Sequence, residues 1–230
     1  MTTHAILSPS SAHRWMKCPA SVALESDYPE MSSEFADEGT AAHEIAARAL
    51  ITDVEAVAFL DTIVTVSGKD YPVTAEMAEH VQKYLDYVNA LKADSIMSAV
   101  EVRLPIGDIT GEEGAEGTSD TITITNDGEL VIVDLKYGMG VKVDAECNPQ
   151  LSLYALGALE LYGLSYDIRK VRLVIVQPRL NHVSEWLCDP GYLEEFKAGV
   201  GNISHICGDV LAAYEKDKTV YADLFEPCDD

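Results

Sequence analysis

Two strand patterns joined by a tight-turn signal restrict the fold more than any other part of the chain. Residues 118–125 alternate between polar and apolar side chains, so Ile122 and Ile124 share one face of a strand. The tripeptide Asn-Asp-Gly at 126–128 favours a hairpin turn. Residues 129–136 continue as an apolar partner strand. We therefore expect a β-sheet at the centre of this 230-residue chain.

Helical patterns surround this hairpin, and short apolar runs add further strands. We expect helices over residues 8–18, 34–51, 75–93, 149–163 and 191–217. Further strands are expected over 99–105, 170–177 and 182–188, with an acidic, glycine-rich loop over 107–117. This order predicts an α/β (α+β) fold in which a mixed central sheet is flanked by helices and preceded by an N-terminal helical region.

The length of the chain suits one well-buried domain. We expect a single domain over 1–230, divided into a mostly helical part (1–95), a sheet core (96–190) and a C-terminal helix and tail (191–230). No apolar run approaches the roughly 20 residues that a membrane helix requires. The N-terminus also lacks the apolar core of a signal peptide. We therefore expect a cytoplasmic protein without a membrane partner.

Charge and cysteine content narrow the classes of function. The net charge of -23 argues against simple nucleic-acid binding, because phosphate contacts need Lys and Arg and the chain has only 16 of them. A local exception is the acid-free stretch before Glu25, which contains Arg14 and Lys17. Five cysteines occur at wide, irregular spacing without a CxxC pair, which argues against a zinc ribbon. We expect reduced cysteines that serve as small apolar residues.

Acidic and basic side chains gather at one end of the predicted hairpin. Asp120 has the strand parity of Ile122 and Ile124. Asp134 and Lys136 are two residues apart, so they point to the same side of the partner strand. Two neighbouring carboxylates repel each other unless a cation joins them, and Mg²⁺ prefers such oxygen ligands. This pattern indicates metal-assisted phosphate chemistry, and the alternative is an ordinary salt bridge at a strand end.

The order of these residues resembles that of a known nuclease family. Gly117-Thr-Ser-Asp120, followed by the hairpin and by Val131-Ile-Val-Asp-Leu-Lys136-Tyr-Gly138, is similar to the core motif of RecB-like nucleases of the PD-(D/E)XK superfamily. Three further stretches match in the expected order: Ser8-Pro-Ser-Ser…Cys18-Pro19, Gly39-Thr-Ala-Ala-His43-Glu44 and Gln150-Leu-Ser-Leu-Tyr154. The resemblance covers roughly residues 5–180 and is greatest to phage and prophage proteins with the same opening.

The resemblance implies a PD-(D/E)XK restriction-endonuclease-like core and a role for each matched residue. The implied catalytic residues are Asp120, Asp134, Lys136, Gln150 and Tyr154. The implied site for Mg²⁺ or Mn²⁺ comprises His43, Asp120, Asp134 and Leu135. The residues expected to contact DNA are Ser10, Arg14 and Lys17, and Glu101 is a candidate additional acid.

Several of these residues also have plainer interpretations. His43 could be an ordinary surface or core histidine, and Tyr154 could pack into the core. Ser8 or Ser10 could cap the first helix. Glu101 could be an exposed strand residue. These alternatives stay open at the level of sequence.

The sequence departs from the family at two places. Ser119 stands where proline often precedes the first acid. Some relatives bind an iron–sulphur cluster through a cysteine at the position of Cys18 and three closely spaced C-terminal cysteines. Here Cys188, Cys207 and Cys228 are far apart, so we expect no cluster.

The resemblance implies a divalent-metal-dependent DNA nuclease, with exonuclease activity in phage recombination or replication. Its partners would then be DNA, a phage single-strand-binding or recombination protein, or further copies of the chain. Two alternatives remain. The chain could be a non-catalytic acidic protein that mimics DNA or binds a partner, as its charge suggests. It could also be a nuclease subunit that acts only within an assembly.

Overall fold

The computed structural model describes residues 5–28 and 32–218 and shows a mixed α/β fold. Within those residues, the central sheet has five strands in the order β3-β4-β5-β6-β7. Their bounds are β3 (Ser95–Pro105), β4 (Glu116–Thr125), β5 (Glu129–Leu135), β6 (Lys170–Gln177) and β7 (His182–Cys188). Strands β5 and β6 are parallel, and the other neighbours are antiparallel. The expected mixed central sheet flanked by helices is confirmed.

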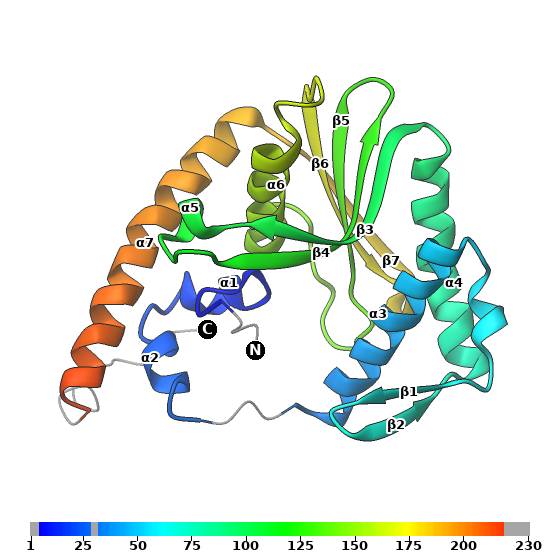
Figure 1. Cartoon of the computed structure of the whole chain (residues 1–230), viewed down its shortest axis with the longest axis horizontal. Helices are drawn as coiled ribbons and strands as arrows, with labels where there is room; N and C mark the ends of the chain where they lie inside the picture. The colour runs from blue at the N-terminus through cyan, green and yellow to red at the C-terminus, as the bar shows by residue number, and fades with distance from the viewer. Residues whose placement is uncertain (1–4, 29–31, 219–230) are drawn as a thin grey trace.

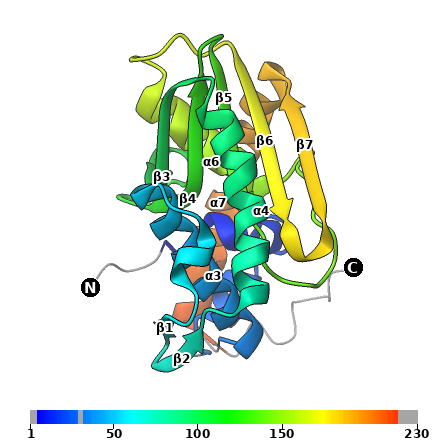
Figure 2. The ribbon, with the colours of Figure 1, turned by 90° about the vertical axis from the view of Figure 1, so that its right-hand side faces the viewer.

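Long helices cover both faces of this sheet (Figures 1 and 2). They are α3 (Glu34–Thr52), α4 (Ala75–Lys92), α6 (Pro149–Tyr162) and α7 (Pro190–Lys216). Helices α3 and α4 bury one apolar cluster with side chains such as Val131 and Val133. Helix α6 buries a second cluster on the other face, with Ile122 and Ile132. Helix α6 is also the crossover that joins the parallel strands β5 and β6, as such pairs require.

A third apolar cluster attaches the N-terminal region to the rest of the molecule. This region contains η1 (Pro9–Ser11), α1 (Ala12–Trp15) and α2 (Ser21–Glu25). Trp15 is buried there together with residues of α7 and with Leu153 of α6. The first turns of the chain therefore lie beside the helix that follows β5.

Side-chain caps explain where the main helices begin. Ser33 accepts from Ala36 N at 3.2 Å before α3, and Thr74 accepts from Met77 N at 3.1 Å before α4. Asn148 caps α6 in the same way, with Pro149 in the first turn. This cap places the next residue, Gln150, at the start of the helix.

The structure corrects several expectations. The first helix is split into η1 and α1 and ends at Trp15, and Ser8 makes no capping hydrogen bond because its hydroxyl pairs with that of Ser11. The loop expected over 107–117 contains α5 (Gly107–Thr110), since the chain turns there around buried Ile109. Strand β3 is longer than expected because it pairs with β4 from Ser95 onward.

Two small elements were not expected. A separate hairpin consists of β1 (Ile63–Val66) and β2 (Lys69–Pro72), joined through Ser67 and Gly68, which both have positive φ. Single 3-10 turns also occur at η2 (Ala56–Phe59) and η3 (Pro178–Leu180). In the described part of the chain, no helix has the length and apolar character needed to cross a bilayer.

Candidate active site

Strand register brings the two predicted acids together at the end of β5. Thr121 of β4 lies opposite Val133 of β5, so the next pair along the antiparallel ladder is Asp120 and Asp134. The Leu135 N–H donates to Asp120 Oδ2 at 2.7 Å. The Asp134 side chain meets Gln150 of α6, whereas the Asp120 side chain meets His43 of α3.

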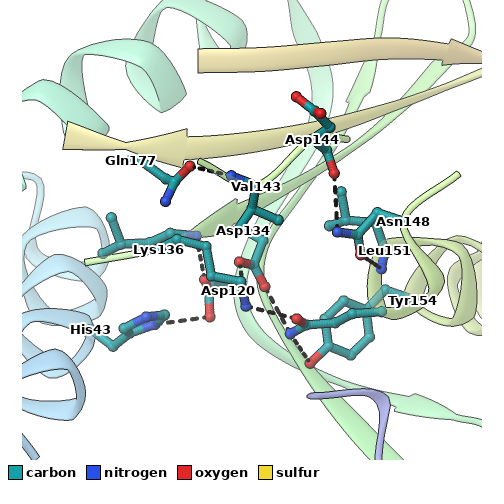
Figure 3. A network of polar contacts seen from close by, with 12 residues as sticks. His43, Asp120, Asp134, Lys136, Val143, Asp144, Asn148, Leu151, Tyr154 and Gln177 are labelled. Atoms are coloured by element: carbon teal, nitrogen blue, oxygen red, sulfur yellow. Dashed lines mark hydrogen bonds and ion pairs between the residues drawn. The ribbon is translucent and has the colours of Figure 1, made fainter. Parts of the chain in front are cut away.

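An imidazole from α3 reaches the first acid. His43 Nδ1 lies 3.1 Å from Asp120 Oδ1 (Figure 3). Burial lowers the pKa of His43, but the Asp120 carboxylate outweighs this effect and raises that pKa to about 9. Burial alone would raise the pKa of Asp120, but His43 and the Leu135 N–H hold that pKa below its usual value. Gly39 lies one turn before His43, and nothing stands within 4 Å of where its Cβ would be.

The second acid belongs to a hydrogen-bonded network with α6. Gln150 Nε2 donates to Asp134 Oδ1 at 3.0 Å and approaches the Tyr154 hydroxyl oxygen at 3.2 Å. Gln150 Oε1 accepts from Lys136 Nζ at 2.7 Å. Gln150 therefore holds the lysine and the carboxylate at once. The predicted sharing of one helix face by Gln150 and Tyr154 is present.

One carboxylate oxygen of Asp134 accepts no hydrogen bond from the described residues. Asp134 is only 3% exposed, and its Oδ2 has no hydrogen-bond partner among the described residues. Lys136 Nζ lies 3.0 Å from this oxygen, as an ion pair without the alignment of a hydrogen bond. Burial, opposed by Lys136 and reinforced by Asp120, raises the pKa of Asp134. A buried carboxylate oxygen whose one close partner among the described residues is an ammonium is a donor that a hard cation could use.

The donor set fits a divalent cation that keeps part of its water. Asp120 and Asp134 offer two adjacent carboxylates, and Mg²⁺ is commonly bound by one or two such groups. The side chain of Leu135 has no donor atom and is fully buried, so only its main chain could bind the cation. Among the described residues, no three His, Cys, Asp or Glu side chains are gathered as a complete metal site. His43 contacts Asp120, and its role as a metal ligand stays a prediction.

Glu101 lies closer to this site than its sequence position suggests. It occupies β3 between Val100 and Val102, whose partners flank Asp120 on β4. Its backbone has φ +52, which is uncommon for a residue of this type. Partial burial, and then Asp120, raise the pKa of Glu101. Glu101 borders the same small depression as His43 and Asp120.

The N-terminal turn packs against the site through a glycine. A Cβ on Gly117 would lie 2.6 Å from Pro9 Cγ and 3.1 Å from Tyr154 Cε1. Only glycine leaves room for Pro9 there, which explains the glycine three residues before Asp120. Ser10 follows on the exposed side of this turn.

The predicted DNA-contacting residues are not all available. Arg14 pairs with Glu25 at 2.7 Å, and Lys17 is exposed. The Glu112 carboxylate accepts from the N–H groups of Ile6 and Leu7. The acid-free segment thus meets carboxylates from other parts of the chain, and its role with DNA stays a prediction.

Sequence reasoning missed the side-chain contacts that support the end of β5. Tyr137 is 3% exposed, and the Arg179 guanidinium lies 5.0 Å from its ring centroid. Arg179 also pairs with Glu38 of α3 at 2.9 Å. These contacts link the residue after Lys136 to the helix that carries His43. The sequence signal for these contacts is Tyr137, which directly follows the Asp-x-Lys pattern.

The cysteines have no bonds to one another in the described residues. Cys18, Cys147, Cys188 and Cys207 are free thiols. Cys188 and Cys207 are buried as expected, whereas Cys147 is exposed. Cys228 lies outside the described residues, and the expected absence of a cluster stays a prediction.

The fold and the site together define a mixed α/β protein whose central strand ends in a partly buried arrangement of two acids, a lysine and an imidazole. The chain belongs to the family described as "Protein of unknown function (DUF2800)", whose model matches residues 4–202.

Two solved structures show a distant likeness. One is a "Putative exonuclease" from Eubacterium rectale, at 10% identity and a TM-score of 0.45, with 97% of this chain and 90% of that chain covered. The other is SSO0001, at 15% identity and a TM-score of 0.34, with 87% and 77% covered. At these values neither likeness assigns a function to this chain.

Proposed function

We propose that this protein is a divalent-metal-dependent DNA nuclease of the RecB-like PD-(D/E)XK type. The observation that carries the proposal is the convergence of Asp120, Asp134 and Lys136 at the end of β5. An ordinary salt bridge would need only Lys136 and one acid. Here a second buried acid stands beside that pair, in contact with an imidazole from a distant helix.

Asp120 and Asp134 would hold the cation, with His43 next to Asp120 and the main chain of Leu135 between the acids. Mg²⁺ or Mn²⁺ in this place supplies polarisation of a phosphodiester and a more acidic bound water. Lys136 is 31% exposed in its side chain, so its ammonium can meet a phosphate or a water while Gln150 holds it. Tyr154 supports Gln150 from the same helix.

The direct test is degradation of labelled linear DNA in Mg²⁺ or Mn²⁺. We expect cleavage by the wild-type protein and its loss in Asp134→Ala and in Lys136→Ala. The matched controls are Asp127→Ala and Lys170→Ala, which remove an exposed ion pair of the same chemistry at the hairpin. Equal activity in the two site variants and in the wild type would end the proposal.

The finer assignments are tested on the same preparation. Exonuclease action requires a strand end, so closed circular DNA should resist and linear DNA should be degraded. A function in phage recombination or replication, and a single-strand-binding or recombination protein as partner, rest on the sequence resemblance. Co-purification of the chain with such a protein, retained in Lys136→Ala, tests that part.

The main alternative is a non-catalytic acidic protein that mimics DNA or binds a basic partner. The charge of -23 favours it. Most of the described basic side chains are paired with carboxylates, which also limits direct contact with phosphates. A tight partner complex without cleavage under any metal would support this alternative. Activity that appears only at high protein concentration would instead indicate a subunit that works in an assembly.

A further inference from the structure

The segment that follows Lys136 is held firmly at both ends. In the view of Figure 1 it descends from the lower end of β5 before the chain returns to α6. Tyr137 is buried at its start. The far end of the segment is bound by Gln177 of β6, which is 2% exposed. Gln177 Oε1 accepts from Val143 N at 2.7 Å, and its Nε2 donates to Val141 O at 3.1 Å. Figure 3 shows the hydrogen bond between Gln177 and Val143.

The tip of this segment exposes apolar side chains, including that of Val141, whose carbonyl oxygen is bound by Gln177. Met139 is 60% exposed and Val141 is 85% exposed. Lys142 is also exposed, and no ion pair involves it in the described part of the chain. A loop with a clamped base and an apolar tip loses little entropy when it binds something, so the exposed side chains are available for contact.

The two glycines of the tip have no structural reason within the described residues. Gly138 and Gly140 both have φ outside the left-handed region. No atom lies within 4 Å of where the Cβ of either residue would be. Neither a special backbone conformation nor tight packing requires glycine here. Glycine at these positions leaves the backbone open to close approach by a ligand.

The short distance along the chain between Lys136 and the tip limits what the tip can contact. Met139 follows Lys136 by three residues, so it lies at most about 10 Å along the chain from the lysine. Stacked nucleotides advance by about 3.4 Å per residue of a strand. A strand with a phosphate at Lys136 therefore carries its neighbouring bases within reach of Met139 and Val141.

We propose that the 138–142 tip contacts the unstacked base next to the phosphate held at Lys136, so that the substrate is a DNA strand with unpaired bases. This inference rests on the proposed nuclease function. Met and Val offer apolar, polarisable surface to the face of a base, as inserted side chains do in other DNA complexes. Bases inside a duplex are stacked and would have to be pulled out, which favours single strands and frayed ends.

The test uses the Met139→Ser/Val141→Ser double variant. Both positions are exposed, so the fold should be retained, and Leu164→Ser is the matched control because Leu164 is fully exposed away from the loop. Binding is measured by fluorescence anisotropy in EDTA, so that Lys136 is kept and metal-dependent cleavage is prevented. The probes are a labelled single-stranded oligodeoxynucleotide, the same strand with abasic sites, and a blunt duplex.

We expect the double variant to bind the single strand about tenfold more weakly, since it loses two apolar contacts with a base. The abasic strand should bind both proteins equally, because it has no base to contact. Duplex should bind more weakly than single strand. Equal binding of the normal strand by variant and parent, or an equal loss on the abasic strand, would overturn the inference.

Cleavage assays separate the two proposals. Metal-dependent cleavage that is unaffected by the double variant, together with unchanged binding, leaves the nuclease proposal standing and removes the tip contact. Base-dependent binding without cleavage by the otherwise wild-type protein removes the nuclease proposal and keeps the tip contact. The double variant should lower cleavage of the normal strand and leave cleavage of the abasic strand at the wild-type rate.

Discussion

Replacing Asp134 by asparagine should stabilise the metal-free protein. The Asp134 carboxylate is 3% exposed, and its Oδ2 has no hydrogen bond in the described residues. Asn has the same shape and keeps an oxygen for the bond from Gln150 Nε2. The substitution therefore removes a buried charge without opening a cavity.

The size of the effect follows from the surroundings of Asp134. Replacing both members of a buried ion pair with neutral groups is neutral or stabilising by about 1–4 kcal/mol, whereas removing one member destabilises when the other charge stays buried and unpaired. The low end applies here, because Lys136 loses a partner 3.0 Å away but keeps its bond to Gln150 and is 31% exposed. We expect a gain of about 1 kcal/mol, or a rise in Tm of about 2–4 °C for a protein of this length.

The assay is thermal unfolding with and without Mg²⁺. Wild-type protein should be stabilised by the cation, by about 2.7 kcal/mol when its concentration is 100 times Kd. The Asp134→Asn variant should start from a higher Tm and respond far less. Asp127→Asn, at an exposed site of the hairpin, should change neither value.

Two results would refute this reasoning. A lower Tm for Asp134→Asn in EDTA would mean that the Asp134–Lys136 pair stabilises the fold more than the burial of its charge costs. An equal response of variant and wild type to Mg²⁺ would mean that the cation binds elsewhere.

Three further changes test the packing around the site, each by urea unfolding. Gly117→Ala should cost about 1–3 kcal/mol, because its Cβ would lie 2.6 Å from Pro9 Cγ; unchanged stability would contradict that contact. Gly199→Ala, in α7 with nothing within 4 Å, should stabilise by about 0.5–1 kcal/mol, and any loss would contradict the open space. Tyr84→Phe removes a buried 2.7 Å hydrogen bond to a threonine hydroxyl and should cost about 1 kcal/mol, whereas exposed Tyr28→Phe should cost nothing measurable.

Local patterns were sufficient for the central hairpin and for the pairing of its two strands. Strand periodicity placed Asp120 on the face of Ile122, and the spacing of Asp134 and Lys136 placed both on one side. The turn at 126–128 set the register that makes the two acids neighbours. These features depend on residues a few positions apart, so a single sequence contains the information.

Alternation alone does not decide whether the threonine face of β4 is buried. A strand with threonines on one side predicts one solvated face. In the structure Thr121 and Thr123 are fully buried, and the Tyr84 hydroxyl of α4 satisfies Thr121. Only the packing of α4 across the sheet decides that this face is covered.

The sequence by itself determined that a hairpin would present two acids and a lysine at one end, because side-chain direction in a strand follows from the two-residue repeat of the backbone. Tertiary structure alone decided that His43 meets Asp120 across 77 positions of sequence and that Gln150 joins Lys136 to Asp134. It also decided that Gln177 clamps the loop beyond the site. Such contacts depend on how α3, α6 and β6 pack around β5, and that packing is a property of the whole chain.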